Sequence, residues 1–413
     1  MTLFMPTADV TARRDILALD SGDDAFITRR ISLTSLSGSA LTGAGSDHLL
    51  RIHGLLSGTT YGIDLGTRSA TDNRIEIAAT GDVLAAFMAL MLRGSSTLLN
   101  AGQITGSAYG IGLQTGTGSG AWVQNTGSIA GGEIAVLRGG AADRAPITLI
   151  NEGHIWGGIA YDGLDSSTGQ DNVLNRSILT GDVLLGGGDD RFENIGGWFE
   201  GIARGEAGND IFLPGDQAER LDGGKGFDTL DFTSAATGIT LALDGSLTAT
   251  GRAAGDSLTG FEAILGSAQG DHLRGNRAAN LLAGQGGDDR LEGGKGRDTL
   301  QGGDGADTLS GGAGADRFLL NSQSEAGDRI TDFSGADRIG LAASLLPGQG
   351  SGALDPAAFR IGPAALDADD RLIFRPSDAT LWLDRDGAGG AAPILLLDLQ
   401  DGAQLGAHQI FLF

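Results

Sequence analysis

Residues 284–319 repeat a nine-residue pattern of glycine, acidic and apolar positions. The four repeats read GQGGDDRLE, GGKGRDTLQ, GGDGADTLS and GGAGADRFL. The sixth position is always aspartate (Asp289, Asp298, Asp307, Asp316) and the eighth is always apolar (Leu291, Leu300, Leu309, Phe318). Glycine turns alternating with short strands account for this spacing, with the eighth residue pointing inward. Two repeats then complete one coil, so every second turn lies on the same edge.

The coil model places acidic side chains in two stacks. One edge carries Asp271, Asp289 and Asp307, and the other carries Asn280, Asp298 and Asp316. Stacked strands lie about 4.7–4.9 Å apart, and two carboxylates at that separation repel by about 1 kcal/mol in water and by more when half buried. Hard divalent cations bind carboxylate and carbonyl oxygens. We therefore expect several Ca2+ ions between the turns, and we expect folding of the segment to require them.

The expected calcium ligands are the sixth-position aspartates and the turn glycines, which expose their carbonyl groups. Two further nonapeptides, Gly205–Phe212 and Gly223–Leu230, add candidates upstream. The predicted ligand residues are Asp210, Asp228, Asp271, Asp289, Asp298, Asp307 and Asp316, with Gly223, Gly224, Gly226, Gly293, Gly294, Gly296, Gly302, Gly303, Gly305, Gly311, Gly312 and Gly314.

A second, longer period precedes the nonapeptides. Asn100-Ala-Gly-Gln-Ile, Asn125-Thr-Gly-Ser-Ile and Asn151-Glu-Gly-His-Ile lie 25 and 26 residues apart, and Asn175-Arg-Ser-Ile follows after 24. Short bursts of alternating apolar residues lie between their glycines. A period of two within a period near 25 predicts a three-sided parallel β-helix with one coil per repeat. The asparagines are expected to stack at one corner, each amide bonding to the next coil.

The nonapeptides resemble those of the RTX (haemolysin-type) calcium-binding family. The stretches Gly327-Asp-Arg-Ile-Thr-Asp-Phe333 and Leu381-Trp-Leu-Asp-Arg-Asp-Gly-Ala-Gly-Gly390 resemble the C-terminal part of serralysin-type RTX domains. The Asn-x-Gly-x-Ile repeats resemble solenoids found ahead of RTX blocks in secreted bacterial proteins. The resemblance implies a calcium β-roll, export by type I secretion machinery through an uncleaved C-terminal signal, and an extracellular location. Asp384 and Asp386 are either a further calcium site or a hairpin turn.

These patterns predict an all-β parallel solenoid in four parts. Residues 1–48 are expected to form an N-terminal cap, 49–203 the β-helix, 204–320 the RTX β-roll, and 321–413 a β-rich C-terminal cap with the secretion signal. The pattern breaks at 232–265, where Gly238–Asp244 alternates and Asp244-Gly245 is a tight-turn signal. A hairpin excursion is expected there. The apolar end Gln409–Phe413 fits either a secretion signal or a buried last strand.

Composition narrows the function. The chain has 413 residues, 72 glycines, no cysteine and a formal net charge of −24, which argues against nucleic acid and anionic membranes as partners. Residues 1–10 lack the basic start and apolar run of a cleaved signal peptide, and the longest apolar run, 83–92, is too short to span a bilayer. The five histidines form no His-Glu-x-x-His motif, and Gly-x-Ser-x-Gly is absent.

We therefore predict a non-enzymatic, secreted calcium-binding protein with a structural or adhesive role at the cell surface or in the extracellular matrix. Self-association and a cell-surface or polysaccharide partner are natural for an open solenoid. The alternative is a carbohydrate-active β-helix enzyme, such as a polysaccharide lyase or epimerase, carried by an RTX module. A carrier left over from a larger secreted toxin is less favoured, because no toxin segment is present.

Overall fold

The computed structural model describes residues 2–116, 120–140, 144–164 and 168–413. These residues fold into short β-strands and single turns of 3-10 helix, with no α-helix among them. The chain divides into two compact units. Unit 1 comprises residues 1–228 and 256–260, and unit 2 comprises 229–255 and 261–413. The all-β solenoid expected from the sequence is confirmed.

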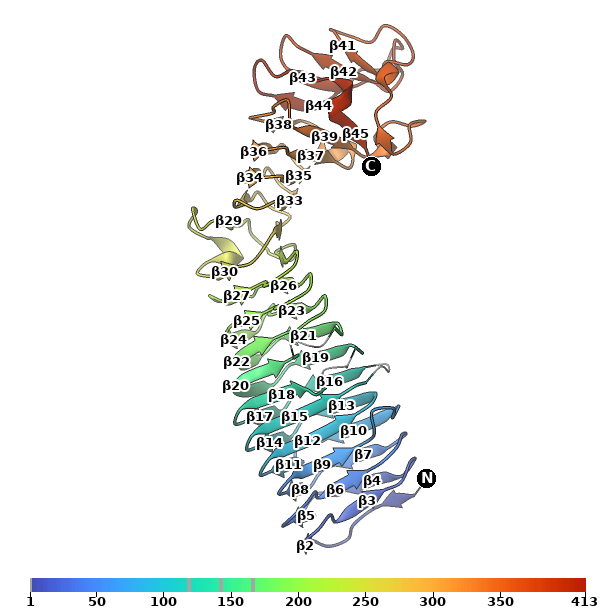
Figure 1. Cartoon of the computed structure of the whole chain (residues 1–413), viewed down its shortest axis with the longest axis vertical. Coiled ribbons are helices and arrows are strands. Elements are labelled where there is room, and N and C mark those ends of the chain that lie inside the picture. Colours follow the sequence, from blue (N-terminus) through green and yellow to red (C-terminus); the bar gives the residue numbers. More distant parts are fainter. Residues whose placement is uncertain (1, 117–119, 141–143, 165–167) are drawn as a thin grey trace. The chain divides into compact units, whose positions relative to one another are not determined.

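Unit 1 is a parallel β-helix whose regular coils contain three strands (Figure 1). The first side consists of β1 Leu3–Phe4, β4 Asp24–Ile27, β7 Leu49–Ile52, β10 Asn73–Ile77, β13 Ser96–Asn100, β16 Ala121–Asn125, β19 Ile147–Asn151, β21 Asp171–Asn175, β23 Arg191–Glu193 and β26 Ile211–Leu213. The second consists of β2 Val10–Ala12, β5 Ser32–Ser35, β8 Leu55–Gly58, β11 Asp82–Ala85, β14 Gln103–Gly106, β17 Ser128–Gly131, β20 His154–Asp162, β22 Ile178–Leu184 and β24 Trp198–Glu200. The third consists of β3 Leu17–Leu19, β6 Leu41–Gly43, β9 Tyr61–Leu65, β12 Met88–Arg93, β15 Tyr109–Gln114, β18 Ile134–Arg138, β25 Ala203–Arg204, β27 Arg220–Asp222 and β30 Ser257–Thr259, and the ends of β20 and β22 complete it.

Inward side chains of unit 1 stack in columns because each coil pairs with the next in parallel register. On the first side Leu98, Val123, Leu149 and Val173 are in register and fully buried. Alternate residues point outward, which is the period of two seen in the sequence. The core is therefore a narrow aliphatic stack running through the coils.

The predicted asparagine stack is present at one corner of unit 1. The side-chain amide of Asn100 donates to Asn125 Oδ1 at 2.7 Å, and Asn125 donates to Asn151 Oδ1 at 2.9 Å. Asn151 and Asn175 continue the series, with bonds of 2.8 and 2.6 Å to the next oxygen. A side-chain amide both donates and accepts hydrogen bonds, so each asparagine donates to the oxygen of the asparagine in the next coil. The series extends one coil further than predicted, to a fifth member, Asn194.

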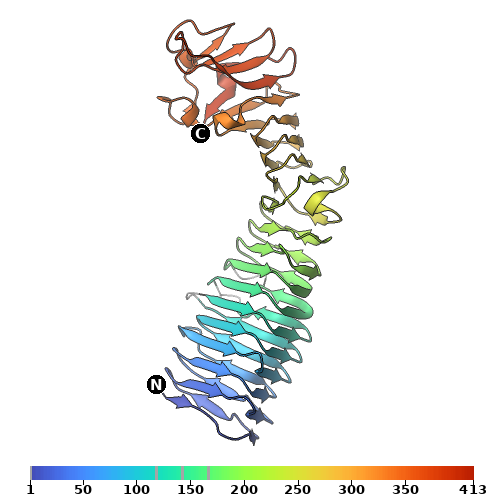
Figure 2. The same cartoon turned by 180° about the vertical axis from the view of Figure 1, so that it is seen from behind.

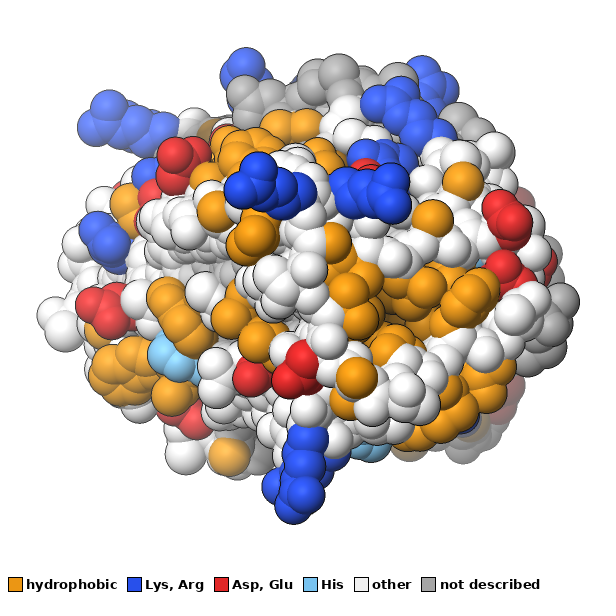
Figure 3. Space-filling view, turned by 90° about the horizontal axis from the view of Figure 1, so that it is seen from below, with side chains coloured by type: hydrophobic (Ala, Val, Ile, Leu, Met, Phe, Trp, Pro, Cys, Tyr) orange, Lys and Arg blue, Asp and Glu red, His pale blue; other side chains and the backbone are white. Residues whose placement is uncertain are grey.

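Residues 3–43, within the segment predicted to form the N-terminal cap, form coils that stack on the β-helix. β1, β2 and β3 pair in parallel with β4, β5 and β6. The two coils that they form are thus continuous with the β-helix. Figure 3 looks onto the N-terminal end, where apolar side chains lie in patches among uncharged polar side chains and backbone, and several basic side chains project outward. Leu3, Met5 and Val10 are exposed.

Unit 2 is built on a narrower coil of two strands. One side consists of β28 Thr229–Asp231, β31 Ala263–Leu265, β33 Leu281–Gly286, β35 Thr299–Asp304, β37 Arg317–Leu320, β39 Arg338–Leu341 and β45 Ile410–Leu412. The other consists of β29 Thr240–Ala242, β32 His272–Arg274, β34 Arg290–Gly296, β36 Thr308–Gly314, β38 Asp328–Ile330 and β44 Ile394–Leu399. Leu282 pairs with Leu300, and Leu291 pairs with Leu309, so one coil takes 18 residues, or two nonapeptides.

The ends of unit 2 depart from the coil. β29 pairs in parallel with β32, so the excursion begins only after Ala242, and η1 Gly251–Ala253 lies within it. At the C-terminal end β40 Gly352–Ala353 pairs antiparallel with β45. β41 Phe359–Ile361, β42 Leu372–Arg375 and β43 Thr380–Leu383 extend the sheet beyond β44 (Figure 2). The remaining 3-10 turns are η2 Gln323–Glu325, η3 Ala343–Leu345, η4 Pro356–Ala358 and η5 Ala407–Gln409.

No helix in the described part of the chain is long and apolar enough to cross a membrane.

Candidate calcium-binding columns

Unit 2 contains two columns of stacked acidic residues, one at each edge of the coil. The first column is Asp271, Asp289, Asp307 and Asp328, and the second is Asn280, Asp298, Asp316 and Asp337. In each column the backbone N–H of one member donates to Oδ1 of the next, at 2.7–3.1 Å. The stacking of Asp271, Asp289 and Asp307, and of Asn280, Asp298 and Asp316, agrees with the nine-residue spacing.

Asp328 and Asp337 are column members that the sequence did not reveal. They follow Asp307 and Asp316 by 21 residues instead of 18, because the chain between them no longer keeps the nonapeptide length. The only sequence signal is the Asp-x-apolar spacing, in Asp328-Arg-Ile330 and Asp337-Arg-Ile339, which matches Asp289-Arg-Leu291.

The second carboxylate oxygen in these columns is buried and has no partner. Oδ2 lies out of contact with solvent and accepts no hydrogen bond in Asp289, Asp298, Asp307, Asp316 and Asp328. The aspartates are at most 3% exposed. A buried ionised oxygen without a partner is strongly unfavourable, so each of these turns requires a proton or a cation.

The oxygens of two successive coils converge above the first glycine of a repeat. A Cβ added to Gly284 would lie 1.9 Å from Asp289 Oδ2 and 2.6 Å from the carbonyl oxygen of Gly302. At Gly293 the corresponding distances are 2.5 Å to Asp298 Oδ2 and 2.6 Å to the Gly311 carbonyl. The carboxylate therefore folds back over a position that only glycine can occupy. A carbonyl and a carboxylate oxygen facing one space are the donors that Ca2+ prefers.

The other glycines of the repeat shape the turn itself. Gly294, Gly303 and Gly312 stand at the second position with φ between +89° and +105°, a region that costs other residues free energy. At the fourth position the turns touch, since a Cβ on Gly305 would lie 1.9 Å from the carbonyl oxygen of Gly287. Gly223, Gly224 and Gly226 repeat the arrangement in unit 1, where a Cβ on Gly223 would lie 2.8 Å from Asp228 Oδ2.

Burial sets the protonation of the columns. Burial, together with repulsion by Asp307 and Asp271, raises the pKa of Asp289 to about 8. It likewise raises the pKa of Asp328 to about 8 and those of Asp298 and Asp307 to about 6. A bound cation acts in the opposite direction, because it stabilises the charged carboxylate. Protons and Ca2+ therefore compete for the same oxygens.

Unit 1 ends in a third column of the same kind, formed by Asp171, Asp190, Asp210 and Asp228. Their backbone N–H groups donate to Oδ1 of the next member at 2.7–2.8 Å. Asp190 and Asp210 each have a buried Oδ2 without a hydrogen-bond partner. Burial raises their pKa values to about 8 and about 7. Asp210 and Asp228 thus share an edge as predicted, while Asp171 and Asp190 were not predicted.

The family model for the RTX calcium-binding nonapeptide repeat matches this chain four times, at residues 195–230, 256–291, 265–300 and 283–318. The chain belongs to the RTX family. Among solved structures it is similar to the AlgE6R3 subunit of the mannuronan C5-epimerase of Azotobacter vinelandii, with 31% identity over 34% of this chain and 77% of that one, at a TM-score of 0.24. No curated protein matches.

In each of the two columns of unit 2, called the RTX columns below, the polar groups of the first residue already have hydrogen-bond partners within the protein. Asp271 Oδ2 accepts from the Ser267 N–H at 2.6 Å, and its Oδ1 accepts from the Ser267 hydroxyl at 3.0 Å. Asn280 donates to the carbonyl of Glu262 at 3.1 Å and accepts from the N–H of Asn276 at 2.8 Å. The oxygens that lack a partner thus lie further along each column.

The predicted Asp-x-Asp-Gly segment connects the antiparallel strands β43 and β44. Asp384 Oδ1 accepts from the N–H of Asp386 at 3.3 Å, and Asp386 Oδ2 accepts from the N–H of Ala391 at 3.0 Å. The latter bond holds the pKa of the exposed Asp386 below its usual value. The two carboxylates therefore stabilise the hairpin loop, which is the turn alternative raised by the sequence.

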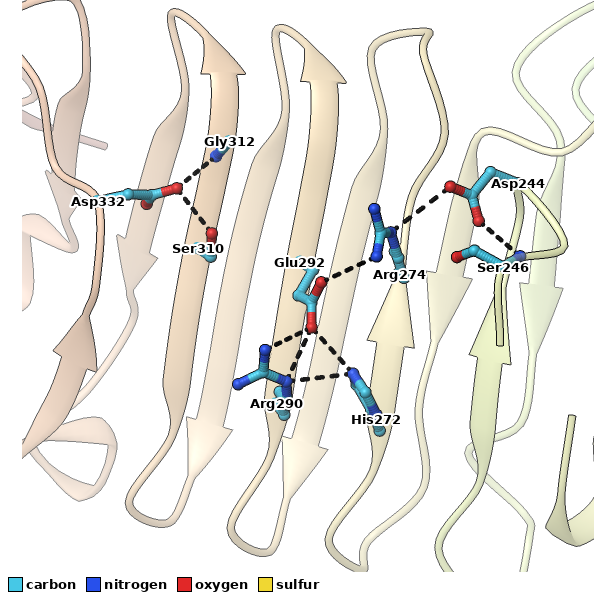
Figure 4. Close-up of polar contacts among 9 residues, drawn as sticks. All are labelled: Asp244, Ser246, His272, Arg274, Arg290, Glu292, Ser310, Gly312 and Asp332. Carbon is cyan, nitrogen blue, oxygen red and sulfur yellow. Dashed lines mark hydrogen bonds and ion pairs between the residues drawn. The ribbon is translucent and has the colours of Figure 1, made fainter. Parts of the chain in front are cut away.

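Outward side chains of the RTX roll form an ionic network (Figure 4). Arg274 lies between Asp244 and Glu292, at 3.5 and 3.4 Å, and joins the excursion to the coil. Glu292 also contacts Arg290 at 2.7 Å and His272 at 3.1 Å. Near the last nonapeptide, Asp332 accepts from the N–H groups of Gly311 and Gly312 and from the Ser310 hydroxyl, at 2.7–2.9 Å.

A group of three or more histidine, aspartate or glutamate side chains able to hold a metal is absent from the described residues. The RTX columns are consistent with this, because their donors are one carboxylate per turn together with backbone carbonyls. His48 is buried and lies 2.9 and 3.1 Å from the carbonyl oxygens of Asp23 and Ala44. His272 belongs to the surface network, so neither histidine is placed as a catalyst.

Proposed function

We propose that this chain is a secreted calcium-binding protein whose RTX roll folds when Ca2+ binds to its aspartate columns. We also propose that it has a structural or adhesive role outside the cell. The observation that carries the proposal is the buried Oδ2 atom that lacks a partner in Asp289, Asp298, Asp307 and Asp316. Such an oxygen recurs at all four turns of the regular block 284–319, beside the first glycine of its own repeat.

The residues proposed to hold calcium are those named by the sequence, together with Asp190 and Asp328. When bound, Ca2+ supplies positive charge between successive turns and so offsets the repulsion of the stacked carboxylates. The chain itself orients the oxygens: each Oδ1 is fixed by a backbone N–H, which leaves Oδ2 facing the glycine of its own turn.

The expected calcium range supports an extracellular location. Extracellular calcium modules typically bind at about 10⁻⁴–10⁻³ M, far above cytoplasmic calcium. The roll would then remain unfolded during export by type I secretion machinery and fold outside. The last strand, β45, is largely buried in unit 2, where it pairs with β39 and β40, so its residues are accessible to such machinery only before folding.

Two surfaces of unit 1 support an adhesive or self-associating role. On the second side Ile178 is in register with His154 and Trp198, and Trp156 lies two residues from His154. Trp156, Ile178 and Trp198 are 37%, 43% and 52% exposed. At the N-terminal end β1, β2 and β3 pair with the next coil along one edge. Within the described residues their other edges have no partner strand, so they could pair with a strand of another molecule.

Calcium titration of the whole chain, followed by circular dichroism, tests the folding proposal. We expect a cooperative gain of β-signal between about 10⁻⁴ and 10⁻³ M Ca2+ and no gain with Mg2+, which demands a tighter octahedral site. An unchanged spectrum in chelator and in calcium contradicts the proposal. Size-exclusion chromatography in calcium tests self-association separately, and a monomer at all concentrations counts against it.

A carbohydrate-active function is the second candidate, because the first side of unit 1 carries two hollows. One of about 480 Å³ is lined by His53, Glu76 and Gln124 among others, and one of about 230 Å³ is lined by Trp122 and Asp72 among others. Exposed indole, amide and carboxylate groups are suited to sugars. Incubation with acidic polysaccharides distinguishes the candidates: chain cleavage or altered uronate stereochemistry supports an enzyme, and unchanged polymer supports the structural role.

A further inference from the structure

The column of Asp171, Asp190, Asp210 and Asp228 contains more buried negative charge than the protein neutralises. These four carboxylates are at most 2% exposed. The buried cation beside them is Arg138, which is fully buried and forms an ion pair with Asp171. Asp190 and Asp210 each have a buried Oδ2 without a hydrogen-bond partner, so each requires a proton or an external cation.

Arg138 occupies a place that belongs to leucine in the preceding coils. Leu65, Leu92 and Leu113 lie in one inward column of β9, β12 and β15, and Arg138 is the next member of that register. The three leucines are almost fully buried. A buried arginine in a leucine column is costly unless its charge is paired, so the position indicates a specific partner.

Asp171 is that partner, and both of its oxygens are occupied. Arg138 donates to Oδ1, which also accepts from the N–H of Ile147 at 3.3 Å. Tyr161 donates its hydroxyl to Oδ2 at 2.6 Å, from an inward position that is valine in the coils on either side. Arg138 is itself held by a 2.6 Å bond to the carbonyl of Ala145. Asp190, one coil later, has an Oδ2 without a partner.

We infer that the Arg138 guanidinium takes the place of a calcium ion at Asp171, so the calcium-dependent part of unit 1 begins at Asp190. This inference rests on the proposed calcium function, and it adds the position in unit 1 at which the requirement for calcium begins. Upstream of Asp171 the same column contains Ile147, Ala121 and Ser96, none of which is acidic. The β-helix through β22 therefore needs no external ion, whereas the turns from Gly186 onward do.

Hydrogen exchange of the full chain, with and without calcium, locates this boundary. In chelator we expect wild-type peptides from 147–184 to be protected and those from 186–228 to exchange at least tenfold faster, with millimolar calcium protecting both. In Arg138→Gln, peptides from 147–184 should lose protection in chelator and regain it in calcium. Arg93→Gln, which breaks the half-exposed pair with Asp64, should behave as wild type.

Several outcomes overturn the inference. One is that peptides 147–184 of Arg138→Gln are as protected in chelator as those of wild type. Another is that peptides 147–184 of wild type are protected only in calcium. If Arg138→Gln fails to fold even in calcium, the double variant Arg138→Gln/Asp171→Asn decides: protection of 147–184 in chelator supports the inference, and its absence overturns it. If calcium changes neither 186–228 nor 284–319 in wild type, the proposed calcium function itself has failed.

Discussion

Asn151 donates its side-chain amide to Oδ1 of Asn175 at 2.8 Å, and two aspartates in the same relation cannot form this bond. The asparagine stack and the aspartate columns each place one short polar side chain per coil at one corner. In the asparagine corner the amide group supplies the donor, so the stack is complete without an ion. In the aspartate columns the second oxygen has no N–H group in its place, so each residue needs a proton or a cation from elsewhere. A coil that carries Asn, with Nδ2, needs no ion at its corner, whereas a coil that carries Asp, with Oδ2, does.

Replacing Asn151 by aspartate should test this contrast directly. The new carboxylate would face Asn175 Oδ1 and the carbonyl of Ile178, to which Asn151 donates at 2.8 Å. We expect unit 1 to lose about 1–3 kcal/mol for each buried group left without its donor, measured by thermal unfolding in chelator. Asn172→Asp, at an outward position of the neighbouring strand β21, is the control. Equal stability of the two variants contradicts the argument.

Removing a column aspartate should weaken calcium binding at one turn. Asp307→Ala deletes the carboxylate whose Oδ2 lies beneath the coil at Gly302. We expect the calcium midpoint of the folding transition to rise about tenfold, corresponding to a loss of about 1.4 kcal/mol. Asp304→Ala is the matched control, because Asp304 belongs to the same repeat but is exposed. Similar midpoints for Asp307→Ala and wild type would remove Asp307 from the ligand set.

The calcium-free roll should become less stable as pH rises. Burial raises the folded-state pKa values of Asp289 and Asp328 to about 8 and that of Asp307 to about 6, whereas an unfolded aspartate titrates near 3.9. The folded state therefore binds more protons, so the stabilisation is fully present below about pH 4 and is lost as pH rises toward 8. Circular dichroism in chelator should show more β-structure at pH 5 than at pH 8.

Calcium binding should release protons over the same range. Calorimetric titrations at pH 7 in two buffers of different ionisation enthalpy measure this release. Identical heats in both buffers, or a chelated spectrum that does not change with pH, would mean that the column carboxylates are already ionised in the folded chain.

The sequence revealed most of the fold, three of the four members of each column in unit 2, and two of the four in the column of unit 1. Asp289 and Asp307 are related by a fixed number of residues, so counting placed them on one edge. Asp328 was missed because the chain lengthens from 18 to 21 residues at that coil. Arg138 was missed because it reaches Asp171 across the coil from 33 residues away. Strict spacing predicts stacked neighbours, whereas contacts between different sides of a coil require the structure.

The first turn of the regular block contains a strained residue. Gln285 stands at the second position of its repeat with φ +78°, where Gly294 and Gly303 have +102° and +105°. A non-glycine residue in this left-handed region costs about 1–2 kcal/mol. Gln285→Gly should therefore stabilise the calcium-bound roll by about 1 kcal/mol, which a denaturant titration in saturating calcium would detect as a higher midpoint. Gln301→Gly removes the same side chain from strand β35 and should instead destabilise the roll by about 0.5–1 kcal/mol. If both variants lose stability, the Gln285 side chain makes a contribution that outweighs its backbone strain.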